Sequence, residues 1–212
     1  LLNLQVLRFL AALLVVVFHI STVSARWSGQ DSIGLIDTIG FVGVDVFFVL
    51  SGFIIHRSTM GESGGSAALR FILRRMARIY LPYLVILAIW AALLFSIGAP
   101  QLKDIDWPRS ISLWPGHLRT LAIQPSWSLS FELYFYGLFA LVIASGRWRH
   151  YALAAIVLGS LWLLAQPYFG AKPVTYEDIF VASPLILEFF LGVAASTLLG
   201  RYRTRHWMPI LA

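Results

Sequence analysis

Residues 41–55 read Phe-Val-Gly-Val-Asp-Val-Phe-Phe-Val-Leu-Ser-Gly-Phe-Ile-Ile, an apolar run that holds one carboxylate, Asp45, near its predicted outer end. A charged side chain at the centre of a membrane helix costs about 2.5–3.5 kcal/mol on insertion scales, so it usually faces protein or water and marks function. The preceding apolar run, 4–23, carries Arg8 and His19. Together these residues predict the polar interior of a membrane-embedded bundle.

The composition is that of a membrane protein. Of the 212 residues, 59% are hydrophobic and only 12% are charged, which is about half the charged share of soluble domains. The mean hydropathy is +0.79. The apolar runs are long and separated by short polar loops, which predicts transmembrane helices rather than barrel strands.

The net charge of +6 does not indicate a nucleic-acid partner, because most basic residues flank apolar runs. The chain has no cysteine, which excludes disulfides, thiolate catalysis and thiolate metal ligands, and we predict no metal site. The first run is not a signal peptide, since it contains Arg8, lacks a small-residue cleavage site and precedes further spans. The chain begins without Met and ends where another apolar segment starts, at Pro209, so we expect a protein truncated at its C-terminus.

The predicted fold is an all-α, polytopic transmembrane bundle that forms one membrane-embedded domain over residues 1–212. A helix needs about 20 apolar residues to cross the hydrocarbon layer. Six runs approach this length, the fifth being the shortest: 4–23, 39–56, 79–97, 127–145, 151–166 and 181–199.

The loops predict the orientation in the membrane. Basic residues gather in alternate loops: Arg8, Arg57, Arg70, Arg74, Arg75, Arg78, Arg147, Arg149, Arg201, Arg203 and Arg205. The opposite loops hold fewer basic residues and most of the acids: Arg26, Lys103, Arg109, Arg119, Lys172, Asp31, Asp37, Asp104, Asp106, Glu177 and Asp178. By the positive-inside rule, the first set and the N-terminus are cytoplasmic. Aromatic residues lie where interface anchors are expected, outside and then inside: Trp27, Trp107, Tyr80, Trp148 and Trp207.

Arg8 and His19 are spaced for a common helix face. They are eleven residues apart, which is about 16 Å along a helix and close to three full turns. Histidine is the side chain best suited to take and return a proton near neutral pH. The alternative is structural: Arg8 reaches the cytoplasmic interface, and His19 makes a hydrogen bond inside the bundle.

Arg75 and Arg78 lie one turn apart on a helix that is predicted to enter the membrane. Such a pair is able to clamp phosphates in a bidentate manner. The alternative is topological, with both arginines at the cytoplasmic face against anionic lipid.

Residues 124–136 read Gln-Pro-Ser-Trp-Ser-Leu-Ser-Phe-Glu-Leu-Tyr-Phe-Tyr, and the apolar run that follows favours a helix over a strand. On a helix, Glu132 shares a face with Ser128 and with Tyr136. A buried Glu132 suits a base, a partner for a cation, or an acceptor for sugar hydroxyls; the alternative is a polar contact between helices. Glu188, in the sixth run, is a further bundle-facing carboxylate to which we assign no role.

These motifs occur in a recognisable order. Arg8-x10-His19 is followed by Gly43-Val-Asp-Val-Phe-Phe-Val-Leu-Ser-Gly-Phe53, by Arg75-x-x-Arg78, and by Ser126-Trp-Ser-Leu-Ser-Phe-Glu132 with Tyr136. Over about residues 2–200 the sequence resembles acyltransferase family 3. This family of integral membrane proteins includes bacterial O-acetyltransferases of exopolysaccharide, lipopolysaccharide O-antigen, peptidoglycan and nodulation factors. Its members usually have about ten spans, so we expect the chain to hold the N-terminal part of such a bundle.

The resemblance implies an O-acyltransferase of the bacterial inner membrane. It would move an acetyl group from cytoplasmic acetyl-coenzyme A to a glycan hydroxyl on the outer side. By this likeness His19 is the catalytic base or a transient acyl carrier, and Arg8 holds the donor or the polar interior. Arg75 and Arg78 are expected to bind the coenzyme A phosphates.

The same likeness assigns Asp45 and Glu132 to the catalytic centre. Together with Trp127 they are expected to shape the acyl tunnel or the acceptor pocket. Ser128 and Tyr136 are expected to bind substrate.

Two other classes of protein fit part of this pattern. A transporter or flippase of a lipid-linked saccharide also needs polar residues inside a bundle, but it needs neither a coenzyme A site nor a proton-transfer group as such. A structural membrane subunit leaves Asp45, Glu132 and Glu188 without a reason for their cost.

Overall fold

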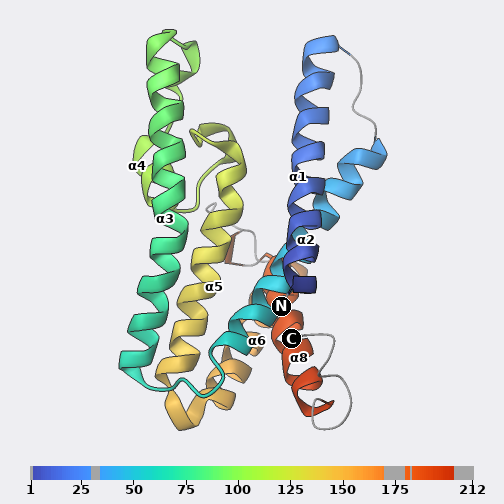
Figure 1. Ribbon diagram of the computed structural model, residues 1–212, viewed down its shortest axis with the longest axis vertical. Helices are drawn as coiled ribbons and strands as arrows, with labels where there is room; N and C mark the ends of the chain where they lie inside the picture. Colours follow the sequence, from blue (N-terminus) through green and yellow to red (C-terminus); the bar gives the residue numbers. More distant parts are fainter. Residues whose placement is uncertain (1, 30–33, 170–179, 182, 203–212) are drawn as a thin grey trace. The chain divides into compact units, whose positions relative to one another are not determined.

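The computed structural model describes residues 2–29, 34–169, 180–181 and 183–202. Every regular element within these ranges is helical (Figure 1), so the predicted all-α fold is confirmed. Some residues that were used above lie outside the described part of the chain, entirely or in their side chains: Arg26, Asp31, Asp37, Lys172, Glu177, Asp178, Arg201, Arg203, Arg205, Trp207 and Pro209.

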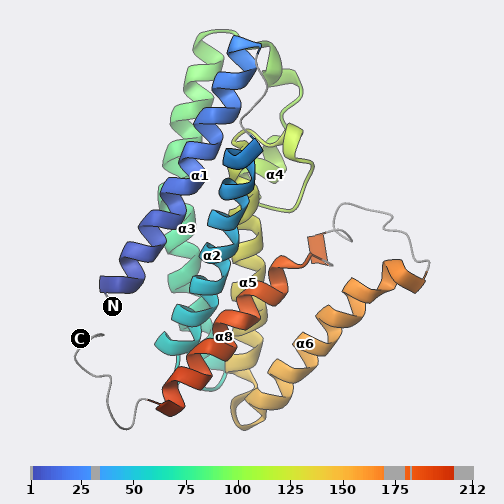
Figure 2. The same cartoon turned by 90° about the vertical axis from the view of Figure 1, so that its right-hand side faces the viewer.

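The chain divides into two compact units. The first unit, Leu1–Met60 with Pro184–Ala212, contains α1 (Leu2–Ser28), α2 (Gly34–Ser58) and α8 (Leu185–Tyr202). Within it, α2 packs against both α1 and α8, and Figure 2 shows α8 crossing α2. Residues 41–55 therefore lie on the central helix of this unit.

Glycines permit the close approach of these helices. A Cβ atom on Gly52 would lie 1.9 Å from the carbonyl oxygen of Phe189, and one on Gly192 would lie 1.9 Å from that of Val49. On the other side of α2, a Cβ on Gly43 would lie 2.8 Å from the carbonyl oxygen of Ala11. Both glycines of the second-span motif thus serve helix packing, as small residues commonly do at helix interfaces in membranes.

The second unit, Gly61–Ser183, is built on three long helices: α3 (Gly65–Ser96), α5 (Trp127–Ala144) and α6 (Arg149–Ala165). Short helical elements connect them: η1 (Pro100–Lys103), α4 (Trp107–Ser112), η2 (Leu118–Thr120), η3 (Gln124–Ser126), η4 (Gly146–Trp148) and η5 (Gln166–Phe169). α5 packs against both α3 and α6.

α3 and α5 run antiparallel, and α5 accompanies only the first half of α3. The N–H of Gly64 donates to the carbonyl of Ile143 (2.9 Å), and the ring of Phe71 lies 6.1 Å from that of Phe139. These contacts align the beginning of α3 with the end of α5.

Among the residues that the structure describes, five helices are long and apolar enough to cross a membrane: Leu4–Ala25, Gly40–Ser58, Gly65–Ser96, Gln124–Ala144 and Gly146–Phe169. The sixth predicted span, 181–199, corresponds to a shorter apolar helix, Leu185–Gly200. The multi-pass membrane architecture follows from this set.

α3 starts well before the predicted third span, 79–97. It begins at Gly65, directly after Gly64, which has a positive φ of 90°. Hydropathy falls at the arginines between residues 70 and 78, whereas arginine, alanine and leucine are good helix formers. The arginines therefore lie on α3 itself, on the half that accompanies α5.

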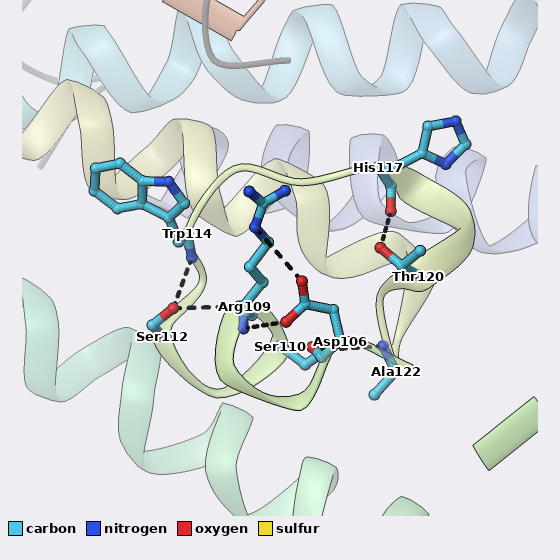
Figure 3. A network of polar contacts seen from close by, with 8 residues as sticks. All are labelled: Asp106, Arg109, Ser110, Ser112, Trp114, His117, Thr120 and Ala122. Atoms are coloured by element: carbon cyan, nitrogen blue, oxygen red, sulfur yellow. Dashed lines mark hydrogen bonds and ion pairs between the residues drawn. The ribbon is translucent and has the colours of Figure 1, made fainter. Parts of the chain in front are cut away.

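The segment between α3 and α5 forms a hydrogen-bonded network around α4 (Figure 3). Asp106 caps α4 by accepting from the N–H of Arg109 (3.0 Å), and its carboxylate also pairs with the Arg109 guanidinium (3.5 Å). The hydroxyl of Ser110 accepts from the N–H of Ala122 (2.9 Å), which ties α4 to the residues just before η3.

Aromatic side chains of α3 hold this segment in place. Tyr80 and Tyr83 donate to the carbonyls of Ser112 and Ser110, and Trp90 donates to the carbonyl of Ala122 (2.9 Å). The sequence predicts Tyr80 at the inner interface and this segment outside. The structure shows that the segment folds back along α3 as far as Tyr80.

Candidate functional site

Arg8 and His19 lie on α1 within the first unit. The Nδ1 of His19 is 2.8 Å from the carbonyl oxygen of Val15, one turn earlier. A carbonyl only accepts, so Nδ1 carries the hydrogen and Nε2 holds the lone pair of the neutral ring. The guanidinium of Arg8 lies 4.9 Å from the centre of the Phe47 ring on α2, which is a cation–π contact.

Asp45 has a partner that the sequence pattern did not reveal. Its carboxyl group lies close enough to that of Glu188 on α8 for the two to interact. Two carboxyl groups share a hydrogen bond only when one of them carries a proton. One oxygen of Glu188, Oε2, is buried without a hydrogen-bond partner among the described atoms. Glu188, to which the sequence assigned no role, therefore lies beside Asp45.

A second polar contact between α2 and α8 was missed altogether. The Nδ1 of His56 lies 2.9 Å from the hydroxyl of Ser196, which is buried. His56 follows Gly52 by one helical turn, and Ser196 follows Gly192 by the same spacing. The signal available in the sequence was a polar residue one helical turn after a glycine in each of the two helices.

The second unit holds the remaining predicted residues. The hydroxyl of Tyr136 donates to Oε1 of Glu132 one turn earlier on α5, as their spacing predicts. Both side chains are buried, with exposed fractions of 6% for Glu132 and 2% for Tyr136. Ser128 instead donates to the carbonyl of Pro125 (3.1 Å), and the ring of Trp127 packs edge-on against Phe131.

Arg75 joins the same cluster from α3. Its guanidinium lies 5.5 Å from the centre of the Tyr136 ring and 5.6 Å from that of Phe71. Arg78, one turn further along α3, is exposed. The two arginines of the predicted pair therefore have different surroundings.

The structure thus groups the predicted site residues in two sets. One set belongs to the first unit: Arg8, His19 and Asp45. The other belongs to the second unit: Arg75, Arg78, Trp127, Ser128, Glu132 and Tyr136.

Comparisons with known proteins agree with this architecture. The model of the acyltransferase domain family matches residues 1–212. Acyltransferase MdmB of Streptomyces mycarofaciens is 30% identical over 95% of this chain and 57% of its own length. The exopolysaccharide production protein ExoZ of Rhizobium meliloti is 27% identical over 82% of this chain and 55% of its own length.

A third relative is the putative membrane-bound transacylase BcsY of Komagataeibacter xylinus, which is 30% identical over 82% of this chain and 46% of its own length. The chain spans about half the length of these curated relatives. No solved structure gives a significant match. Because the family model covers the whole chain, the chain belongs to acyltransferase family 3, the acyltransferase domain family of membrane proteins.

Proposed function

We propose that the chain forms part of a membrane-bound O-acyltransferase. The enzyme moves an acyl group, acetyl in the first instance, from cytoplasmic acyl-coenzyme A to a hydroxyl of an envelope or exported glycan. Family membership supports acyl transfer. The names of two relatives, an exopolysaccharide production protein and a membrane-bound transacylase, support a glycan acceptor and a reaction at the membrane.

The geometry of His19 carries this proposal. With Nδ1–H bound to the Val15 carbonyl, Nε2 is the basic nitrogen of a ring held in one tautomer. Nε2 takes the proton of the acceptor hydroxyl as the hydroxyl oxygen attacks the thioester carbonyl carbon. The new C–O bond forms, the C–S bond breaks, and the proton passes to the departing thiolate of coenzyme A.

The same nitrogen also suits a covalent route. Nε2 then attacks the thioester carbonyl carbon itself and releases the thiolate. The glycan hydroxyl oxygen takes the acyl group from Nε2 as the C–N bond breaks, and the hydroxyl proton passes to the thiolate. Both routes depend on the lone pair of Nε2.

The other residues have supporting roles in this proposal. Arg8 holds the donor or the polar interior beside His19, and Asp45 shapes the acyl path. The Arg75-x-x-Arg78 motif of α3 provides the site for donor phosphates on the cytoplasmic side of the inner membrane, where the N-terminus also lies. Trp127, Ser128, Glu132 and Tyr136 contact the acceptor.

The test is acyl transfer by the full-length protein in membrane vesicles. Labelled acetyl-coenzyme A is supplied together with an O-deacetylated envelope glycan, and label in the glycan is measured. We expect His19→Ala to abolish incorporation without loss of membrane insertion, whereas His117→Ala, at an exposed histidine between α3 and α5, retains wild-type incorporation. Undiminished incorporation by His19→Ala would rule out the role proposed for this residue.

A further inference from the structure

Four arginines follow one another on the first half of α3, and one of them differs from the others. Arg70, Arg74 and Arg78 are exposed, whereas Arg75 is half-buried. The guanidinium of Arg75 lies against the aromatic rings of Phe71 and Tyr136. Arg75 therefore points toward α5 rather than toward water.

The buried carboxylate of Glu132 explains why a cation is held there. An ionised carboxylate that is removed from water costs free energy unless hydrogen bonds and an opposite charge compensate it. Tyr136 supplies one hydrogen bond to Glu132. The guanidinium of Arg75 lies 5.5 Å from the centre of the ring of the same tyrosine. One tyrosine thus links the anion to the cation.

An arginine that binds phosphate has a different requirement. Coenzyme A carries several negative charges on a large, hydrated group, so an arginine that binds its phosphates has to be accessible to that group. Arg78 is exposed and lies one turn from Arg75. Arg74 is exposed as well, but it is paired with Glu62 at 3.3 Å.

We propose that Arg75 is a positioning residue that, together with Tyr136, holds the Glu132 carboxylate, and that Arg78 rather than Arg75 binds a phosphate of the acyl donor. The second half of this statement rests on the proposed function. The first half rests only on contacts within the second unit. The Arg75-x-x-Arg78 motif then combines two separate roles instead of one bidentate clamp.

The experiment uses the full-length protein in nanodiscs and measures two quantities for each variant. One is the Kd for acetyl-coenzyme A, and the other is the Tm of the protein without ligand. The variants are Arg75→Met, Arg78→Met, and the double variant Arg75→Met with Glu132→Gln. Arg74→Met is the matched control for the loss of one positive charge from the same helix.

We expect Arg75→Met to lower the Tm and to leave the Kd within about twofold of wild type. We expect Arg78→Met to raise the Kd about tenfold or more with an unchanged Tm, because it removes a charge-assisted hydrogen bond to the donor. The double variant recovers most of the lost Tm, since a neutral amide at position 132 needs no counter-charge. Arg74→Met changes neither quantity appreciably.

Two results would overturn the inference. One is an Arg75→Met protein whose Kd rises as far as that of Arg78→Met at an unchanged Tm. The other is a double variant no more stable than Arg75→Met, because a purely steric role of Arg75 would not respond to the charge at position 132. If Arg75→Met does not accumulate, Arg75→Lys replaces it; we expect a wild-type Kd and a small loss of Tm, and a tenfold weaker Kd contradicts us.

Failure of the proposed function is recognised separately. If the wild-type protein shows no saturable binding of acetyl-coenzyme A, the donor assignment and the role of Arg78 both fall. Recovery of the Tm in the double variant would then still support the link between Arg75 and Glu132.

Discussion

The two compact units hold polar side chains among apolar helices in different ways. In the first unit, α2 and α8 cross so closely that Gly52 and Gly192 leave no room for a Cβ atom. Its carboxyl contact, between Asp45 and Glu188, joins two helices that are distant in the sequence. In the second unit, Glu132 receives its hydrogen bond from a tyrosine on its own helix.

Because of this difference, we expect the two units to respond differently to substitution. Polar contacts between helices require a fixed crossing, so a change at the crossing of α2 and α8 disturbs every contact along it. A contact between neighbouring turns of one helix survives small movements of that helix. We therefore expect the first unit to be the more sensitive to changes in side-chain volume, and the second to changes in charge.

The largest effect is expected at the crossing of α2 and α8. Gly192→Ala places a Cβ atom 1.9 Å from the backbone oxygen of Val49, which cannot move aside without shifting α2. We expect the free energy of unfolding to fall by about 3 kcal/mol, at the upper end for single substitutions. Unfolding of the purified protein in detergent measures this loss.

Gly137→Ala is the matched control on α5, because nothing lies within 4 Å of a Cβ atom there. This substitution should change the free energy of unfolding by no more than about 1 kcal/mol. Equal losses for both variants would show that the two units do not differ in the way described.

A smaller effect is expected from the carboxyl pair of the first unit. Glu188→Ala removes one partner of the carboxyl contact with Asp45 and leaves the other in an apolar bundle, so we expect a loss of about 1–3 kcal/mol. Glu188→Gln keeps a hydrogen-bond donor and should lose less than half as much. Unfolding measurements on both variants decide this, and a glutamine variant as unstable as the alanine variant would contradict the pairing.

The segment between α3 and α5 provides an intermediate test in the second unit. Tyr83→Phe removes only the hydroxyl that donates to the carbonyl of Ser110. We expect a loss of about 1–2 kcal/mol, since a buried acceptor loses its partner. Tyr151→Phe, at an exposed tyrosine of α6, should be neutral in the same unfolding assay. A neutral Tyr83→Phe would mean that the segment is not held by this contact.

The smallest effect is expected at the surface of the second unit. Glu62→Gln breaks the ion pair with Arg74, in which the arginine side chain is 62% exposed. Exposed pairs contribute little because water and salt screen them, so the loss should stay below about 1 kcal/mol and shrink further in high salt. A loss as large as that of Glu188→Ala would contradict the distinction between buried and surface charge.

The sequence was sufficient for the features that depend on neighbouring residues. Long apolar runs predicted the all-α membrane fold, and the spacing of four residues predicted that Glu132 and Tyr136 share a face. The contact of Asp45 with Glu188 could not be predicted in this way, because it depends on how α2 and α8 cross.

The different surroundings of Arg75 and Arg78 could not be predicted either. Their spacing places them on neighbouring parts of one helix surface. Which of the two becomes half-buried depends on the face of α3 that α5 covers, and on the aromatic rings of Phe71 and Tyr136 that meet Arg75 there. The early start of α3 could not be predicted from hydropathy, because hydropathy reports burial in lipid rather than the extent of a helix.

The central claim, acyl transfer from coenzyme A to a glycan, is tested most directly by stoichiometry. The full-length wild-type protein in vesicles is given acetyl-coenzyme A and O-deacetylated envelope glycan, and free coenzyme A thiol and glycan-bound acetyl are measured together. The account predicts that both products appear in equal amounts and only when donor and acceptor are both present. Movement of the glycan across the vesicle membrane without release of thiol would contradict it and indicate a transporter.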